Sequence, residues 1–179
     1  MKGRKVHIRF FQPRDAAQKL KLEIANRDFF ETYSVTRYSD FYTLEMQQEL
    51  IEIYADQKED DLSYSFGIFE NESDLLVGTI SLVQVIRGPM QSAILGYALD
   101  KAYNNRGYMT EAIELTVAYA FKKLALHRIE AGVMPGNEAS IRVLEKAGFH
   151  REGIASKNVE INGKWQDHQI LAIINPRDL

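Results

Sequence analysis

The 179-residue chain is 45% hydrophobic and carries a formal net charge of −3, which suits a single folded domain over residues 1–179; its dispersed lysines and arginines argue against direct binding to nucleic acid. The absence of cysteine excludes disulfides, thiolate metal sites and covalent chemistry at cysteine. Every apolar run is shorter than the ~18 residues of a membrane span, and the opening MKGRKVHIRF lacks the apolar stretch of a secretory signal, so we expect no membrane association and a cytoplasmic location.

The apolar patterns predict, in chain order, a strand, two helices, three strands, a helix, a strand, a short helix and a hairpin. The strands are expected over residues 6–10, 64–69, 75–83, 92–99, 127–134, 149–161 and 165–174, the last two joined by Asn162-Gly163. The helices are expected from a cap at Asp15 to about Asn26 and over residues 43–57, 110–126 and 138–147, with Gly148 ending the last one.

The stretch YNNRGYMTEA, residues 103–112, joins the strand over residues 92–99 to the helix over residues 110–126. A crossover helix makes its two flanking strands parallel neighbours, so this turn is expected at the carboxyl end of a strand, where open α/β sheets bind ligands. Gly107 lets the backbone come close to a ligand, the free N–H groups of a helix start attract an anion, and Arg106 adds a cation. The pattern predicts an anion site; the alternative is an ordinary strand-to-helix turn.

Within this stretch, NNRGYM resembles the acetyl-CoA pyrophosphate loop of the GCN5-related N-acetyltransferase (GNAT) superfamily. The pattern of that superfamily is Gln or Arg, two residues, Gly, one residue, then Gly or Ala. Aligned on Gly107, Asn104 and Met109 stand at the two ends and depart from the pattern. The resemblance assigns to acetyl-CoA binding the residues Leu99, Asn104, Asn105, Arg106, Gly107, Tyr108, Met109 and Thr110.

A second motif follows after one expected strand. PGNEASIRVLEKAGF, residues 135–149, resembles the superfamily segment Asn-x-x-Ser/Ala that ends in Lys-x-Gly-Phe. The resemblance implies that Asn137 binds the pantetheine arm of acetyl-CoA; the alternative is a helix N-cap. It also implies that Ser140 contacts acetyl-CoA and protonates the leaving thiolate as the catalytic acid, since Leu144 stands where many relatives carry a tyrosine. The alternative for Ser140 is a hydroxyl packed on a short helix.

A third segment, residues 149–168, contains GF, EG and INGKWQDH and looks like the carboxyl-terminal hairpin of the ribosomal-protein alanine N-acetyltransferases (RimJ/RimL-like). LGYALDKAYNNRGYMTEA resembles their strand and loop, and the opening HIRFFQPRDA fits their first strand and turn. The resemblance implies the GNAT fold: an α/β (α+β) domain with a mixed, mostly antiparallel, twisted sheet of about seven strands flanked by helices. In this fold a splayed parallel strand pair binds acetyl-CoA.

The resemblance also implies the activity, that of an acetyl-CoA-dependent N-acetyltransferase with acetyl-CoA as cosubstrate and no metal. The expected acceptor is a primary amine that attacks directly, with the N-terminal α-amine of a protein such as a ribosomal protein as the favoured case. The alternatives are a small amine, such as a polyamine or an antibiotic, and a non-catalytic acyl-CoA-binding regulatory domain. Many relatives are homodimers, so a homodimer is allowed, although the sequence carries no interface signature.

Two tyrosines are expected to bind the acceptor. Tyr33 belongs to the aromatic stretch over residues 29–42, which is expected to form one wall of the substrate site; the alternative is core packing plus a surface loop. Tyr97 lies on the expected strand over residues 92–99. An unpaired N–H near Leu95, Gly96 or Tyr97 is expected to bind the thioester carbonyl oxygen.

The general base is left open by the sequence. Ile94 and Val159 stand at two positions where some relatives carry a glutamate. Glu160, Asp167 and His168 are the local candidates, and the alternative for each is a strand-surface or structural residue. A free α-amine has a pKa of about 8, so part of it is neutral at pH 7 and a strong base is unnecessary.

Overall fold

A computed structural model describes residues 1–178 of the chain. Within these residues, seven strands form one sheet in the order β1-β2-β3-β4-β5-β7-β6. The strands are β1 (Val6–Phe10), β2 (Tyr64–Glu70), β3 (Leu76–Ile86), β4 (Ser92–Leu99), β5 (Arg128–Val133), β6 (His150–Ile161) and β7 (Lys164–Ile174). The α-helices are α1 (Ala16–Ala25), α2 (Arg27–Glu31), α3 (Leu44–Glu59), α4 (Tyr108–Lys123) and α5 (Glu138–Lys146).

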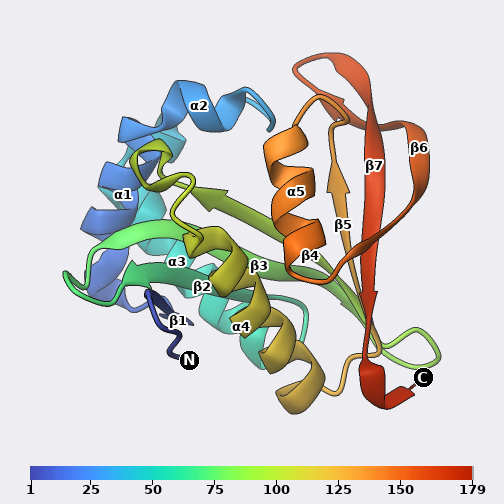
Figure 1. The fold of residues 1–179 in the computed structure, drawn as a ribbon. Helices are drawn as coiled ribbons and strands as arrows, with labels where there is room; N and C mark the ends of the chain where they lie inside the picture. The colour runs from blue at the N-terminus through green and yellow to red at the C-terminus, as the bar shows by residue number, and fades with distance from the viewer. Residues whose placement is uncertain (179) are drawn as a thin grey trace.

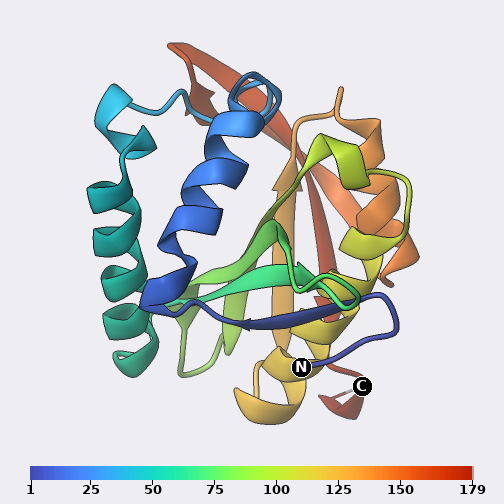
Figure 2. The ribbon, with the colours of Figure 1, turned by 90° about the vertical axis from the view of Figure 1, so that its left-hand side faces the viewer.

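The sheet lies between two helical layers. Helices α1 and α3 pack together on one face, against β3 and β2, while α4 packs on the other face against β1 and β3 and beside α5. Figure 2 shows the blue and teal helices on one side of the strands and the yellow and orange helices on the other. No helix within residues 1–178 has the length and apolarity needed to span a membrane.

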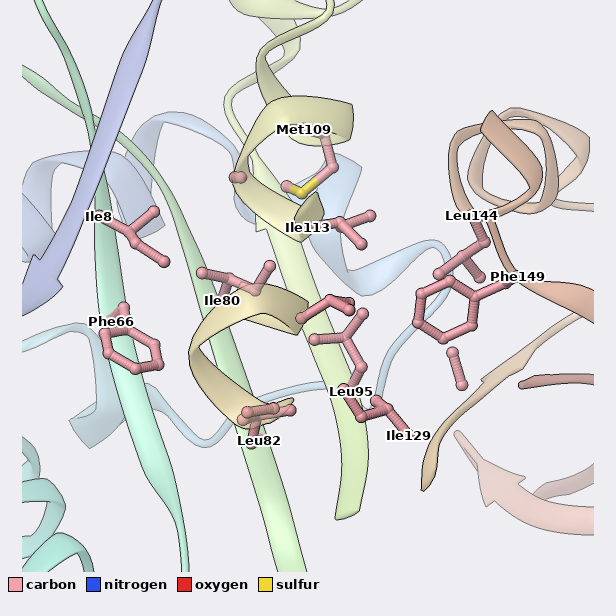
Figure 3. Packing of buried hydrophobic residues seen from close by; sticks show 14 of the residues in the cluster. Ile8, Phe66, Ile80, Leu82, Leu95, Met109, Ile113, Ile129, Leu144 and Phe149 are labelled. Atoms are coloured by element: carbon pink, nitrogen blue, oxygen red, sulfur yellow. The ribbon is translucent and has the colours of Figure 1, made fainter. Parts of the chain in front are cut away.

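The main hydrophobic core fills the space between the sheet and the layer of α4 and α5. Figure 3 shows Met109 and Ile113 of α4 and Leu144 of α5 beside Leu95 of β4 and Ile129 of β5, all of them buried. These strand residues have odd numbers, and side chains alternate between the two faces of a strand. The odd-numbered residues of β4 and β5 therefore face α4 and α5.

Five of the six neighbouring strand pairs in the described sheet are antiparallel, and the pair β4–β5, which flanks α4, is parallel. The expected three-strand meander, the parallel pair across the crossover helix and the carboxyl-terminal hairpin are all confirmed. In the hairpin turn, Asn162 and Gly163 have φ of +51° and +75°, which is the conformation that a two-residue turn between twisted strands requires.

Most predicted element boundaries agree with the structure within a few residues. The helix expected over residues 110–126 is α4, from 108 to 123, because Gly107 (φ +78°) precedes its first turn and Ala125 (φ +53°) follows its end in left-handed conformations. The strand expected over residues 75–83 extends to Ile86 past an irregularity near Gln84, whose φ is +50°. The short helix α2, Arg27–Glu31, was not expected from the sequence; the stretch 29–42 contains its end and a 3₁₀ turn, Ser39–Tyr42.

The two predicted helix ends differ in outcome. Gly148 has a φ of +93°, and Phe149 N–H donates to the Leu144 carbonyl, so the glycine stop is confirmed. Asp15, in contrast, makes no side-chain cap to α1. Its carboxylate accepts hydrogen bonds from Arg9 (2.6 and 2.8 Å), and that ion pair takes the place of the predicted cap.

Candidate active site

The parallel strands β4 and β5 separate part of the way along their length. Their pairing covers Ser92–Ile94 of β4 opposite Arg128–Glu130 of β5, and Figure 1 shows the strands diverging beyond it. From Leu95 to Leu99, β4 keeps its other neighbour, β3. A strand directs its N–H groups alternately to its two neighbours, so this half of β4 presents unpaired backbone N–H groups to the gap. These include the region from Leu95 to Tyr97 expected to bind the thioester carbonyl.

The loop before α4 has the features of an anion site. Gly107 occupies the N-cap position without a side-chain cap, so N–H groups of the first turn of α4 remain free. The Arg106 guanidinium lies 5.0 Å from the centre of the Tyr103 ring. The Arg106 carbonyl accepts a hydrogen bond from Lys5 Nζ (2.6 Å). Positive charge from two side chains and a helix start therefore gathers at one loop.

The other loop residues predicted to bind acetyl-CoA lie in different environments. Asn104 and Asn105 are exposed and can contact a ligand directly. Tyr108 is turned toward β2, where its hydroxyl donates to Glu70 Oε1 (2.5 Å). Leu99 and Met109 are buried in the core, so they support the loop from below, and the neighbouring Thr110 is half-buried.

The start of α5 lies over the gap between β4 and β5 (Figure 1). Asn137 Oδ1 accepts the Ser140 N–H (3.2 Å), so its side chain caps α5, which is the alternative considered for this residue. Ser140 Oγ lies 2.6 Å from Tyr97 Oη. Tyr97, expected on the acceptor side, thus points to the α5 side of the sheet, because it is odd-numbered like Leu95. Burial raises the pKa of Tyr97 to about 12.

The aromatic stretch expected to form one wall of the acceptor site, residues 29–42, lies around the end of α2 and the loop that follows it. Tyr33 is 41% exposed and Tyr38 is 87% exposed, whereas Tyr42 is half-buried and donates from its hydroxyl to Glu31 Oε1 (2.8 Å). Asn162, at the tip of the β6–β7 hairpin, accepts the Thr36 N–H at 2.9 Å. The aromatic stretch is therefore partly exposed and is joined to the hairpin tip.

The three candidate bases lie on β6 and β7. Glu160 is exposed, and Asp167 Oδ1 accepts the Lys157 N–H (2.8 Å). His168 is only 7% exposed and lies beside Gly132 of β5. Within residues 1–178, no group of three or more His, Asp or Glu side chains is arranged to bind a metal.

The sequence did not reveal the role of the amino-terminal segment at this site. Glu111, in the first turn of α4, accepts backbone N–H groups of Arg4, Lys5 and Val6 at 2.7, 2.8 and 2.9 Å. These contacts bring Lys5 to the loop at Arg106. The partners are more than one hundred positions apart along the chain, so no local pattern could signal them.

A splayed parallel strand pair with a glycine loop at the following helix was the arrangement expected of the GNAT fold. Residues 5–150 match the family model described as "Acetyltransferase (GNAT) domain". The chain belongs to the GNAT acetyltransferase family. It is an N-acetyltransferase that uses acetyl-CoA, and it lies in the RimJ-like part of the family.

Three relatives define this position within the GNAT family. A probable N-acetyltransferase of Bacillus subtilis (strain 168), YjcK, is 56% identical over 99% of this chain and 98% of its own. The crystal structure of a ribosomal-protein-S5-alanine acetyltransferase from Vibrio fischeri has a TM-score of 0.92 and 30% identity, covering 98% of this chain and 96% of its own. RimJ of Mycobacterium smegmatis, solved in complex with CoA-disulfide, has a TM-score of 0.90 and 26% identity, covering 97% and 83%.

Proposed function

We propose that residues 1–179 form a single GNAT domain that acetylates the N-terminal α-amine of a protein, such as a ribosomal protein. The observation that carries this proposal is the match to the Vibrio fischeri S5-alanine enzyme along nearly the whole chain. That match includes α2 and the β6–β7 hairpin, which lie on the expected acceptor side. The TM-score of 0.92 and the 30% identity to that enzyme support a common acceptor class.

The site fits acetyl-CoA in three respects. The free N–H groups at the start of α4 and the Arg106 cation suit its pyrophosphate. Gly107, with a φ of +78°, places no side chain between this backbone and a ligand. The unpaired half of β4 offers N–H groups for the pantetheine amides and the thioester oxygen. Acetyl-CoA supplies the acetyl group in activated form.

The chain's own residues provide positioning and proton transfer. The acceptor amine bonds to the carbonyl carbon as the carbon–sulfur bond breaks, while an N–H donor near Gly96 binds the carbonyl oxygen. Ser140 donates a proton to the sulfur. Its Oγ is hydrogen-bonded to Tyr97 Oη at 2.6 Å. Because burial raises the pKa of Tyr97 to about 12, its hydroxyl remains protonated at neutral pH and can donate to Ser140.

The test is calorimetric titration with acetyl-CoA, followed in the same sample by thiol release on adding acceptors. The acceptors are peptides with a free α-amine, the same peptides with a blocked α-amine, and polyamines. We expect tight acetyl-CoA binding and thiol release only with the free peptides. Release with polyamines alone would contradict the proposed acceptor, and the absence of acetyl-CoA binding would contradict the proposed site.

A further inference from the structure

The gap between β4 and β5 opens on two faces of the sheet. Odd-numbered residues such as Leu95 and Ile129 face α4 and α5 (Figure 3). Even-numbered residues face the side on which α1 and α3 cover β3 and β2. At β4 and β5 this second face is more open: Ile94 is 37% exposed, and Gly132 is exposed.

Two glycines lie on either side of the gap on this open face. The parallel register pairs Ile94 with Glu130; continued by two residues, it places Gly96 opposite Gly132, beyond the point where pairing ends. Neither residue carries a side chain. Among the described residues, a Cβ on Gly96 would have one neighbour within 4 Å, Ser81 Oγ at 3.7 Å. The open face therefore leaves space beside Gly96 at the level expected for the thioester.

His168 of β7 borders this opening. A Cβ on Gly132 would lie 3.6 Å from His168 Cδ2 and 3.7 Å from His168 Cβ, so the imidazole lies on the open face beside Gly132. The residue as a whole is 7% exposed, and packing against the strand restricts the orientation of the ring. Gly96 of β4, Gly132 of β5 and His168 of β7 therefore border the opening from three different strands.

The hydrogen bonding of the ring defines its free nitrogen. His168 Nδ1 lies 3.3 Å from the Gln166 carbonyl oxygen. A carbonyl oxygen can only accept, so this hydrogen bond forms in the neutral-ring tautomer that carries its proton on Nδ1. Nε2 then has a lone pair, and it has no protein partner within residues 1–178. Every fully buried side-chain nitrogen or oxygen in those residues has a partner. Nε2 must therefore reach solvent.

We propose that His168 is the general base of the acetyl transfer, accepting a proton at Nε2 from the acceptor amine. This inference rests on the proposed N-acetyltransferase site at the β4–β5 gap. It places the base on the open face, where the amine enters, and the acid pair Ser140 and Tyr97 on the α5 face, where the thiolate leaves. The two proton transfers then occur on opposite sides of the sheet.

The proton balance is complete with these groups. The acceptor ammonium gives one proton to His168 Nε2 and becomes a neutral nucleophile. Its nitrogen bonds to the carbonyl carbon, the carbon–sulfur bond breaks, and the sulfur takes a proton from Ser140. The nitrogen loses its second proton to water as the amide forms. Ser140 regains a proton from water on the α5 face, and His168 releases its proton to water, so that one proton is released in each turnover.

The carboxylates on the same face are engaged elsewhere. Arg128 donates to Glu130 Oε1 (2.7 Å) and to Glu152 Oε1 (2.8 Å). The hydrogen bond from Arg128 lowers the pKa of Glu152 to about 2. On β6, the residue that pairs with His168 is the uncharged Ala155. Arg128 therefore engages both Glu130 and Glu152, whereas His168 Nε2 has no protein partner among the described residues.

The main test compares His168→Gln with His127→Gln, a control at a half-buried histidine that contacts Asp178 far along the sheet. We expect His168→Gln to lower kcat at pH 7 by about 100-fold, the usual lower range for a lost general base, with unchanged acetyl-CoA affinity. The deficit should shrink as the pH rises above ~8, where the α-amine becomes neutral without help. The control should keep wild-type kcat at every pH.

Two outcomes separate this inference from the proposed function. Wild-type kcat in a folded His168→Gln protein, or a deficit that does not change with pH, would overturn the role of His168 and leave the acetyltransferase intact. If the wild type releases no thiol with any amine, the proposed function fails first. If His168→Gln does not fold, ¹⁵N NMR of the wild-type histidines decides: a proton on His168 Nε2 in the neutral ring would overturn the proposal.

Discussion

The pair formed by Ser140 and Tyr97 is the most informative contact at the scale of single residues. The serine belongs to a recognisable motif, but its partner comes from β4, 43 positions earlier. The phenol is half-buried, and its raised pKa of about 12 keeps it a donor. A hydroxyl that receives a hydrogen bond becomes a better donor itself, because neighbouring hydrogen bonds polarise one another. The pair is therefore better suited to protonate a thiolate than Ser140 alone.

Replacing Ser140 by alanine should lower kcat by about 100-fold, the typical effect of a lost acid, and leave acetyl-CoA affinity nearly unchanged. Steady-state kinetics and calorimetry on the same preparation measure the two effects. Ser156→Ala, at an exposed serine of β6, is the control and should retain wild-type kinetics. Wild-type kcat in folded Ser140→Ala would show that the hydroxyl only packs on α5.

Replacing Gly107 by alanine should weaken acetyl-CoA binding by about 10-fold or more, because the methyl group lies where the pyrophosphate approaches the helix start. The new Cβ would lie 3.3 Å from Lys5 Nζ. Gly88→Ala is the control: its φ is +71° and a Cβ there has no neighbour within 4 Å among the described residues. Both variants should lose about 1–2 kcal/mol of stability from backbone strain. If Gly107→Ala and Gly88→Ala bind acetyl-CoA with equal affinity by calorimetry, the loop before α4 is not part of the binding site.

At the scale of elements, α4 and the amino-terminal segment behave as one unit. Glu111 accepts three backbone N–H groups of that segment and lies in the first turn of α4, where a negative charge is favourable. Burial alone would raise the pKa of Glu111, but these donors lower it overall. The carboxylate therefore connects the loop before α4 to the edge of the sheet.

Replacing Glu111 by glutamine should destabilise the protein by about 1–3 kcal/mol, because at least one of the three N–H groups loses its charged acceptor. Urea unfolding measures the change, and Glu114→Gln, at an exposed residue of the same helix, should stay near wild type. The pKa of Glu111 is lower in the folded than in the unfolded state, so its stabilisation is present above pH 4.5 and is lost as the pH falls further. The difference between wild type and Glu111→Gln should shrink accordingly; a constant difference would contradict this account.

At the scale of the whole molecule, three tyrosines connect global stability to alkaline pH. Burial raises the pKa of Tyr42, Tyr64 and Tyr97 to about 12. In the unfolded chain a tyrosine loses its proton near pH 10. Between pH 10 and about 12 the unfolded state releases these protons and the folded state retains them. The free energy of unfolding should therefore fall across this range.

Replacing Tyr97 by phenylalanine should reduce that alkaline loss by about 1 kcal/mol at pH 11, one unit above the unfolded pKa. Urea unfolding at pH 8.5 and pH 11 measures the loss in each protein. Tyr38→Phe, at a side chain that is 87% exposed, should lose as much stability as the wild type. An equal loss in Tyr97→Phe would mean that the Tyr97 phenol titrates alike in both states.

Contacts between distant segments could not be predicted from the sequence. The strand pattern placed Tyr97 on β4 but could not say which face it serves, because that depends on which layer of helices covers the odd-numbered positions. Asp15 was expected to cap α1, yet the more favourable partner was Arg9, a charged donor from β1. No local sequence pattern distinguished His168, because its proposed role depends on its position beside Gly132 in another strand.

The sequence by itself determined the seven strands, the helices α1, α3, α4 and α5, the parallel pair β4–β5 and the family, because these follow from periodicity, turn chemistry and motifs within a few dozen residues. It did not reveal α2. Only the tertiary structure decided which side chains meet: Lys5 with the Arg106 carbonyl, Tyr97 with Ser140, and His168 with the open side of Gly132. The physical reason is that each contact depends on sheet order and on the separation of two strands. Those are set by the packing of the whole core and not by any segment alone.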